Sequence, residues 1–113
     1  MHNSVRRSAA LILLYLGELN RMKARFETQC GEDSSQSHAN ALKCYNRARI
    51  ICPHEGKIFH ELGVSCHHEE DYLAAVYFFA RAMSCANPRI SSKENLINLF
   101  QEIRLKDIEV TQT

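Results

Sequence analysis

This sequence of 113 residues contains no apolar run long enough to cross a membrane. Its longest apolar run, residues 9–16, is far shorter than the roughly 20 residues that a membrane-spanning helix needs. Two arginines precede the run, as they would in a signal peptide, but no small-residue cleavage site follows it. We therefore interpret the run as part of a buried helix face and expect no membrane partner.

The sequence also lacks an even set of cysteines from which a disulfide framework could be built. Its five cysteines are scattered along the chain, at positions 30, 44, 52, 66 and 85. Free thiols that pack as small apolar residues fit a reducing compartment. We therefore expect the protein in the cytoplasm, the nucleus or both.

A large excess of positive charge is missing as well. The formal net charge is +1, which is not the strongly basic balance of a nucleic-acid-binding module. Hydrophobic residues make up 45% of the chain and charged residues 24%, which is ordinary for a single globular domain.

What the sequence does contain is one motif that occurs twice. The pattern A-x3-Y-x2-A-x4-P recurs 34 positions later, between positions 41 and 75, with phenylalanine for tyrosine and the proline one step late. The two copies are Ala41, Tyr45, Ala48 and Pro53, followed by Ala75, Phe79, Ala82 and Pro88. This period and pattern are typical of a tetratricopeptide repeat, a pair of antiparallel helices that pack through small and aromatic residues.

The upstream half of the repeat, W-x2-L-G, is also present twice. It is matched by Phe59, Leu62 and Gly63, and one repeat earlier by Leu13, Leu16 and Gly17. Ala41 follows Gly17 by 24 positions, whereas Ala75 follows Gly63 by 12. The first repeat therefore carries 12 extra residues, and we place this insertion in a polar loop at residues 30–37.

Apolar periodicity and helix-stop signals predict five helices. Their expected ranges are about 5–27, 38–52, 56–67, 72–86 and 91–104. In the first, Ile12, Leu16, Leu19 and Phe26 recur at helical spacing and predict its buried side. We expect an all-α fold of antiparallel helix pairs, a tetratricopeptide-like right-handed α-solenoid, in which residues 1–113 form a single domain. Two repeats are fewer than the roughly three that such arrays need, so we expect a fragment of a larger helical domain.

Residues 15–21, Y-L-G-E-L-N-R, resemble the Y-L-G-D-L-x-R segment of the telomerase-associated Est1 family, which includes the SMG proteins of nonsense-mediated mRNA decay. Further segments resemble the family in the same order, at residues 41–53, 56–62, 75–82 and 92–104. The resemblance covers residues 8–104 and includes the insertion. The chain departs from the family pattern at Met22, at Ile58 and at the pair His60-Glu61.

The resemblance implies a 14-3-3-like region that binds phosphoserine and continues into an all-helical extension. In the decay proteins the phosphorylated partner is the central RNA helicase, and in the telomeric branch the partners are telomerase RNA and protein. We therefore expect a non-catalytic protein-interaction module that recruits a phosphorylated partner in nonsense-mediated mRNA decay. Two alternatives stay open: an RNA- or DNA-binding fragment of a telomerase subunit, and a generic tetratricopeptide scaffold that binds an unphosphorylated peptide.

Arg21 is the residue that the resemblance marks as a phosphate contact, and Arg25 lies on the same side of the helix one turn later. A guanidinium suits phosphate because its planar fork donates two parallel hydrogen bonds. The alternative is a solvated Arg21 that pairs with Glu18, three positions earlier on the helix.

The third predicted helix offers a second candidate surface, a peptide-binding groove. The positions that face the concave side of such repeats are occupied by Lys57, His60, Val64 and His67. The alternative is that these four side chains are ordinary solvated surface.

We expect no metal, no cofactor, no small-molecule substrate and no enzymatic activity. Residues 66–68 read Cys-His-His, with Cys52 and His54 upstream, but a zinc site needs about four converging ligands and paired C-x2-C spacing is absent. A catalytic Cys–His pair has no evident orienting acid. The aromatic residues at 72, 77, 78 and 79 are read as interhelix packing, with stacking on RNA bases the alternative for any that stay exposed.

Overall fold

The computed structural model describes residues 2–112, and over that range the chain is all-α, as predicted. Its five helices are α1 (His2–Gln29), α2 (Ser35–Ile51), α3 (Gly56–His68), α4 (Tyr72–Ser84) and α5 (Ser92–Gln112). The fifth helix is about two turns longer than the periodicity predicted, because it continues to Gln112. Among the described residues, no helix combines the length and the apolar character that a bilayer crossing requires.

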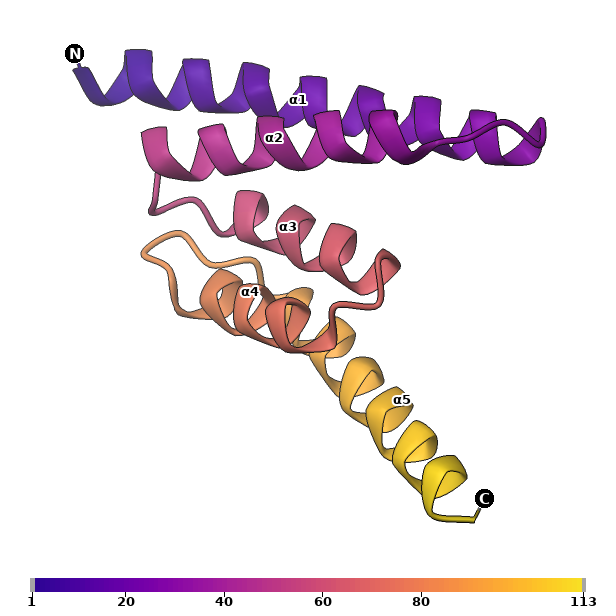
Figure 1. Ribbon diagram of the computed structural model, residues 1–113. Helices are drawn as coiled ribbons and strands as arrows, with labels where there is room; N and C mark the ends of the chain where they lie inside the picture. The colour runs from indigo at the N-terminus through magenta and orange to yellow at the C-terminus, as the bar shows by residue number, and fades with distance from the viewer. Residues whose placement is uncertain (1, 113) are drawn as a thin grey trace.

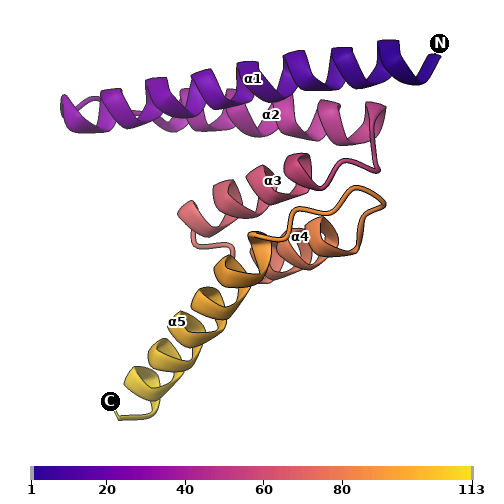
Figure 2. The ribbon, with the colours of Figure 1, turned by 180° about the vertical axis from the view of Figure 1, so that it is seen from behind.

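The helices form two stacked antiparallel hairpins and a projecting arm. In Figure 1, α1 and α2 lie side by side as one layer, α3 and α4 form the next hairpin, and α5 runs away from α4 at a steep angle. The reverse view in Figure 2 shows the same order. The molecule measures 58 × 35 × 17 Å along its principal axes, so it is flat, and much of each helix remains at the surface.

Each hairpin closes on a contact between a glycine and an aromatic ring. A Cβ atom on Gly17 would lie 2.4 Å from the Tyr45 ring, and one on Gly63 would lie 2.7 Å from the Phe79 ring. Both rings are completely buried. The repeated motif therefore corresponds to a repeated packing unit: the glycine of the first helix leaves the space that the aromatic residue of the second helix fills.

The alanines of the motif are buried beside these rings. Ala41 and Ala48 flank Tyr45, while Ala75 and Ala82 flank Phe79. One core cluster joins α1, α2, α3 and the end of α4, and a second cluster joins α4 to α5 around Leu99. Burial of these side chains removes apolar surface from water, which is the main favourable contribution to folding.

The turns that end the two hairpins pair with each other. The amide of Gly56 donates to the carbonyl of Asn87 over 2.8 Å, and the amide of Asn87 donates to the carbonyl of His54 over 3.0 Å. A Cβ atom on Gly56 would approach backbone atoms of α4 and the following turn within 2.6 Å, so the approach requires glycine there. This contact ties the α2–α3 turn to the α4–α5 turn.

The prediction of which side of α1 is buried was wrong. Ile12 is 61% exposed, and Leu16, Leu19 and Phe26 are exposed as well, whereas Leu14 on the opposite side is fully buried. Small residues decide the orientation: Ala10, Gly17 and Ala24, seven positions apart, are all buried and let α2 approach closely. Because α1 is apolar on both sides, its periodicity alone could not show which side faces the core.

The polar connection predicted at residues 30–37 is shorter in the structure: residues 30–34 lie between α1 and α2, and α2 begins at Ser35. The connection between α1 and α2 ends at Ser34, and residues 35–37 form the first turn of α2. The Asp33 carboxylate accepts hydrogen bonds from the Ser35 amide (3.0 Å) and hydroxyl (2.6 Å), and Ser37 is buried with its hydroxyl 2.5 Å from Glu27. The extra residues thus lengthen α1 and α2, which have 28 and 17 residues against 13 each for α3 and α4.

The orientation of α1 can be tested with two leucines on opposite sides of the helix. We expect Leu14→Ala to lower the free energy of unfolding by about 2–5 kcal/mol, because it leaves a cavity in the core. Leu19→Ala, on the exposed side, should change it by no more than about 0.5 kcal/mol. Urea denaturation of both variants measures the difference; equal losses would contradict the orientation.

The glycine–aromatic contact predicts that Gly63→Ala destabilises the protein despite the higher helix propensity of alanine. Overpacking against Phe79 should cost about 1–3 kcal/mol, which exceeds the roughly 1 kcal/mol gained in propensity. Thermal denaturation measures the loss. If the clash with the ring is the cause, Phe79→Leu in the same chain should restore part of the stability, so that the two changes are not additive; strict additivity would exclude this cause.

Candidate functional site

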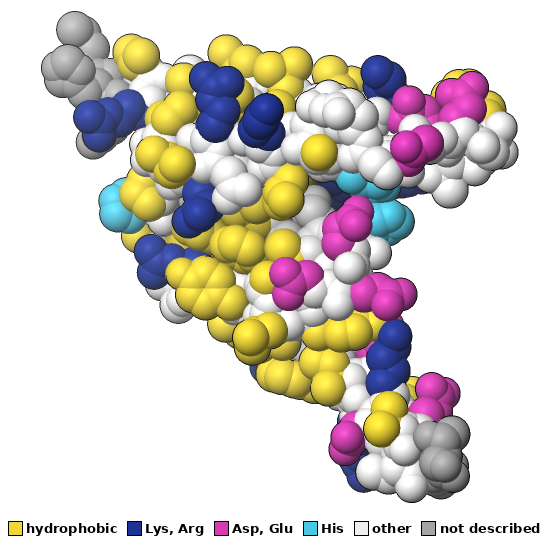
Figure 3. All heavy atoms as spheres, in the orientation of Figure 1, with side chains coloured by type: hydrophobic (Ala, Val, Ile, Leu, Met, Phe, Trp, Pro, Cys, Tyr) yellow, Lys and Arg dark blue, Asp and Glu magenta, His cyan; other side chains and the backbone are white. Residues whose placement is uncertain are grey.

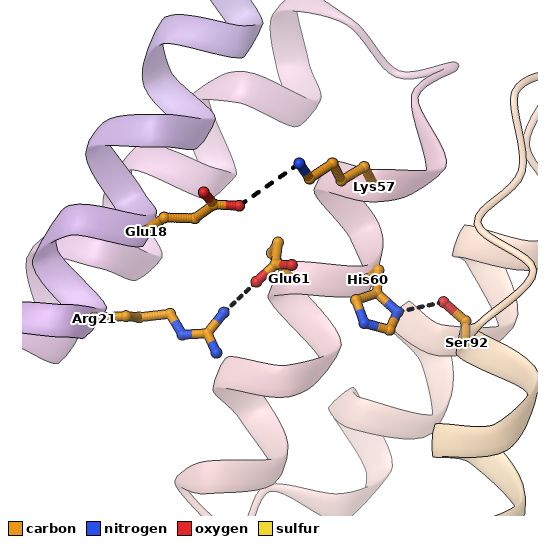
Figure 4. Close-up of polar contacts among 6 residues, drawn as sticks. All are labelled: Glu18, Arg21, Lys57, His60, Glu61 and Ser92. Carbon is orange, nitrogen blue, oxygen red and sulfur yellow. Dashed lines mark hydrogen bonds and ion pairs between the residues drawn. The ribbon is translucent and has the colours of Figure 1, made fainter. Parts of the chain in front are cut away.

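Arg21 lies on the inner side of α1 and points toward α3, where it forms an ion pair with Glu61 (Figure 4). The Arg21 side chain is 21% exposed and the Glu61 side chain 13% exposed, so the pair is largely shielded from water. The expected partner, Glu18, lies 3.8 Å from the ammonium group of Lys57 instead. The alternative of a solvated Arg21 paired with Glu18 is therefore wrong.

The phenol of Tyr45 completes the surroundings of the Arg21 guanidinium. Its hydroxyl is buried without a hydrogen-bond partner among the described residues, and burial raises the pKa of Tyr45 to about 12. Burial acts to lower the pKa of Arg21, but the adjacent Tyr45 hydroxyl and Glu61 carboxylate outweigh it and raise that pKa. Arg21 is therefore held as a cation within reach of a neutral phenol and a carboxylate.

Arg21 and Arg25 share a concavity of about 190 Å³ between α1 and α3. Arg25 is exposed at its rim. The other lining residues are Thr28, Gln29, His38, Val64, Ser65 and His68. This lining contains cationic side chains and hydrogen-bond donors but no carboxylate, so it is suited to a small anion.

A larger concavity of about 480 Å³ lies on the other side of His38 and His68, which line both spaces. The two imidazole rings stack with their centroids 4.4 Å apart. Burial and the neighbouring His68 lower the pKa of His38, although Glu69 opposes the shift. Figure 3 shows histidine side chains in the notch where the α1–α2 layer meets the rest of the molecule.

Sequence reasoning did not find this histidine pair. It considered residues 66–68 together with Cys52 and His54, but Cys52 packs against the core and His54 is exposed in the turn between α2 and α3. His38 and His68 are 30 positions apart, at the start of α2 and the end of α3. They meet because the two helices are antiparallel, and no local spacing signals the contact.

The four residues expected to line a groove on α3 lie along one side of the helix, but their side chains have different partners. Lys57 points toward α1, and Val64 lines the concavity beside Arg21. His60 is buried, with its Nδ1 atom 2.6 Å from the Ser92 hydroxyl and its ring edge against Phe79.

The fourth residue, His67, also faces away from α1. Its Nε2 atom lies 2.5 Å from the Glu102 carboxylate of α5. The polar side chains of α3 are therefore divided between two directions: Lys57 and Glu61 reach toward α1, and His60 and His67 reach toward α5.

Comparison with known proteins agrees with the resemblance found in the sequence. The family described as the Est1 DNA/RNA binding domain matches residues 41–112. The chain is also 31% identical over 87 residues to the Telomerase-binding protein EST1A of Danio rerio. That similarity covers 77% of this chain and 6% of the Danio rerio protein, so the chain spans a small part of the length of this relative. The family match begins within α2, which leaves Arg21 and Arg25 outside it.

Two shielded histidines predict that the protein loses stability in mild acid. Burial, followed by Arg89 and Arg21, lowers the pKa of His60 below its usual 6.5, and the pKa of His38 is lowered too. The unfolded chain therefore binds protons more readily, so the contribution of these two histidines to the free energy of unfolding is greatest above pH 6.5 and is lost as the pH falls from 6.5 toward their folded-state pKa values.

Urea denaturation across this pH range measures the effect in the wild-type chain and in His60→Gln. We expect the variant to show a weaker dependence on pH, because one of the two titrating groups is removed. His54→Gln, which alters an exposed imidazole, serves as the control and should keep the wild-type dependence. An unchanged dependence in His60→Gln would count against the assignment.

Proposed function

The chain belongs to the Est1 family, and from this premise we propose that it is a non-catalytic interaction module that binds a phosphorylated segment of a partner protein. The observation that carries the proposal is the concavity in which Arg21 and Arg25 converge with hydrogen-bond donors and without a carboxylate. A phosphate monoester carries about −1.5 to −2 charges at neutral pH and three acceptor oxygens. Two guanidinium groups and the surrounding hydroxyl and imidazole groups match that demand.

The two arginines have different roles in this proposal. Arg25 is exposed and makes the first contact with the incoming phosphate. Arg21 is already neutralised by Glu61, so it contributes only when the phosphate competes for its guanidinium. The Arg21 guanidinium can turn from the Glu61 carboxylate to the phosphate, because a planar carboxylate and a tetrahedral phosphate each accept two parallel hydrogen bonds. Glu61 therefore acts as a built-in competitor that favours dianionic phosphate over a single carboxylate.

The partner that fits this proposal is a phosphorylated RNA helicase of nonsense-mediated mRNA decay, which the protein would bind in the cytoplasm or the nucleus. This choice of partner is supported by the family membership and by the cationic side chains that line the concavity. No cofactor is needed, because recognition uses only fixed charges and hydrogen bonds.

A second candidate, binding of telomerase RNA or DNA, is favoured by a specific observation. The family that matches residues 41–112 is described as an Est1 DNA/RNA binding domain. On α4, Tyr77 is 58% exposed and could stack on a base, whereas Phe79 is buried in the core. The balanced net charge of +1 argues for the phosphoprotein as the first choice.

The first experiment is a titration with a phosphoserine-glutamine peptide and its unphosphorylated twin. We expect binding of the phosphorylated form, and a loss of at least about tenfold in affinity in Arg25→Glu, since one charge-assisted hydrogen bond is worth about 1.5–3 kcal/mol. Glu61→Gln should tighten binding, because it frees Arg21. Arg104→Glu, on the exposed surface of α5, is the matched control for charge reversal and should bind like the wild type.

The same titration at two salt concentrations separates the two candidates. Single-stranded RNA that binds with a steep salt dependence, together with equal affinity for both peptides, would replace the first candidate by the second. If Arg25→Glu bound the phosphopeptide as well as Arg104→Glu did, the concavity would not be the site.

A further inference from the structure

We propose that His38, His68 and Glu69 form a binding site for a divalent transition-metal ion, with Zn²⁺ as the ion that their chemistry fits best. Each of the three residues offers one ligand atom, and these atoms all lie within 4.8 Å of one another. Two imidazoles and one carboxylate are a known ligand set for zinc sites that keep a fourth position open. The site uses neither Arg21 nor Arg25, although His38 and His68 also line the concavity proposed to bind phosphate.

The ligand atoms are close to the spacing that a bound ion would impose. In a tetrahedral site with metal–ligand bonds of about 2.0–2.1 Å, ligand atoms lie about 3.4 Å apart. Because no two of the three ligand atoms are more than 4.8 Å apart, each pair needs to come closer by no more than about 1.4 Å to bind an ion. His68 and Glu69 are exposed, so rotation of their side chains can supply this movement without disturbing the core.

The surroundings give an ion access to the three ligands. The three residues line the concavity of about 480 Å³ together with Asp71 and Ser34. This lining contains no lysine or arginine that would repel an ion. The cation whose field reaches His38 is Arg21, and its charge is already balanced by Glu61. A water molecule can occupy the fourth position of the ion.

An ion at this point would join α2 to α3 far from their covalent connection. The two helices are linked by the turn at residues 52–55, whereas His38 and His68 lie at the other end of the antiparallel pair. The notch between them is open in Figure 3. Bound metal would hold the two hairpins together on the side that the turn does not reach, so it should raise the thermal stability of the folded chain.

The test is a titration of the reduced chain with Zn²⁺ and, in parallel, with Co²⁺ as a spectroscopic probe. We expect one ion per chain, a higher Tm in the presence of Zn²⁺, and a Co²⁺ spectrum without the near-ultraviolet charge-transfer band of a thiolate ligand. His38→Ala should weaken binding at least about tenfold, since even an outer-shell partner of a ligand is worth that much. It should also abolish the rise in Tm.

His54→Ala removes an exposed imidazole outside the cluster and is the matched control; it should bind both ions like the wild type. Circular dichroism of each variant shows whether it is folded. A thiolate band in the Co²⁺ spectrum would assign binding to the free cysteines and overturn the proposal. Equal affinity in His38→Ala and His54→Ala, or no saturable binding at all, would overturn it as well.

Discussion

The packing of one aromatic ring over one glycine in each hairpin is the constraint on which the rest of the structure depends. Tyr45 fills the space above Gly17, and Phe79 fills the space above Gly63. The contact fixes the distance between the two helices and also their rotation about their own axes. Arg21 lies one turn after Gly17 on nearly the same side of α1, next to Tyr45, and from there its side chain reaches Glu61 of α3. The position of the candidate phosphate contact is therefore a consequence of how the first hairpin closes.

The repeated sequence motif predicted most of this fold, because its residues are the ones that pack the two helices of each hairpin together. A small residue facing an aromatic residue, at a fixed spacing and followed by a proline, leaves few other arrangements. The rotation of α1 could not be read from hydrophobic periodicity, because leucine and isoleucine occupy both of its sides. The small residues Ala10, Gly17 and Ala24 did carry the answer, since only close approach of another helix explains them.

The candidate site could be predicted only in part, and the reason is charge pairing across distant helices. Arg21 was identified as a candidate, but its partner Glu61 lies 40 positions away in the sequence. The same holds for Glu18 and Lys57, which link α1 to α3 with the opposite order of charges. Together the two ion pairs connect the first and third helices across the edge of the second. A ligand that withdraws Arg21 from Glu61 therefore also loosens a contact between the two hairpins.

The apolar residues on the exposed side of α1 recur at a spacing that restricts the angle at which a second helix could pack against them. Ile12, Leu19 and Phe26 are seven residues apart, with Tyr15 and Met22 between them, and all five are at the surface. This is the alternating three-and-four spacing of a left-handed supercoil. A second helix that packed there would run nearly alongside α1, at a crossing angle of about 20°. Such a helix would therefore be oriented differently from α5, which crosses α4 at a steep angle (Figure 1).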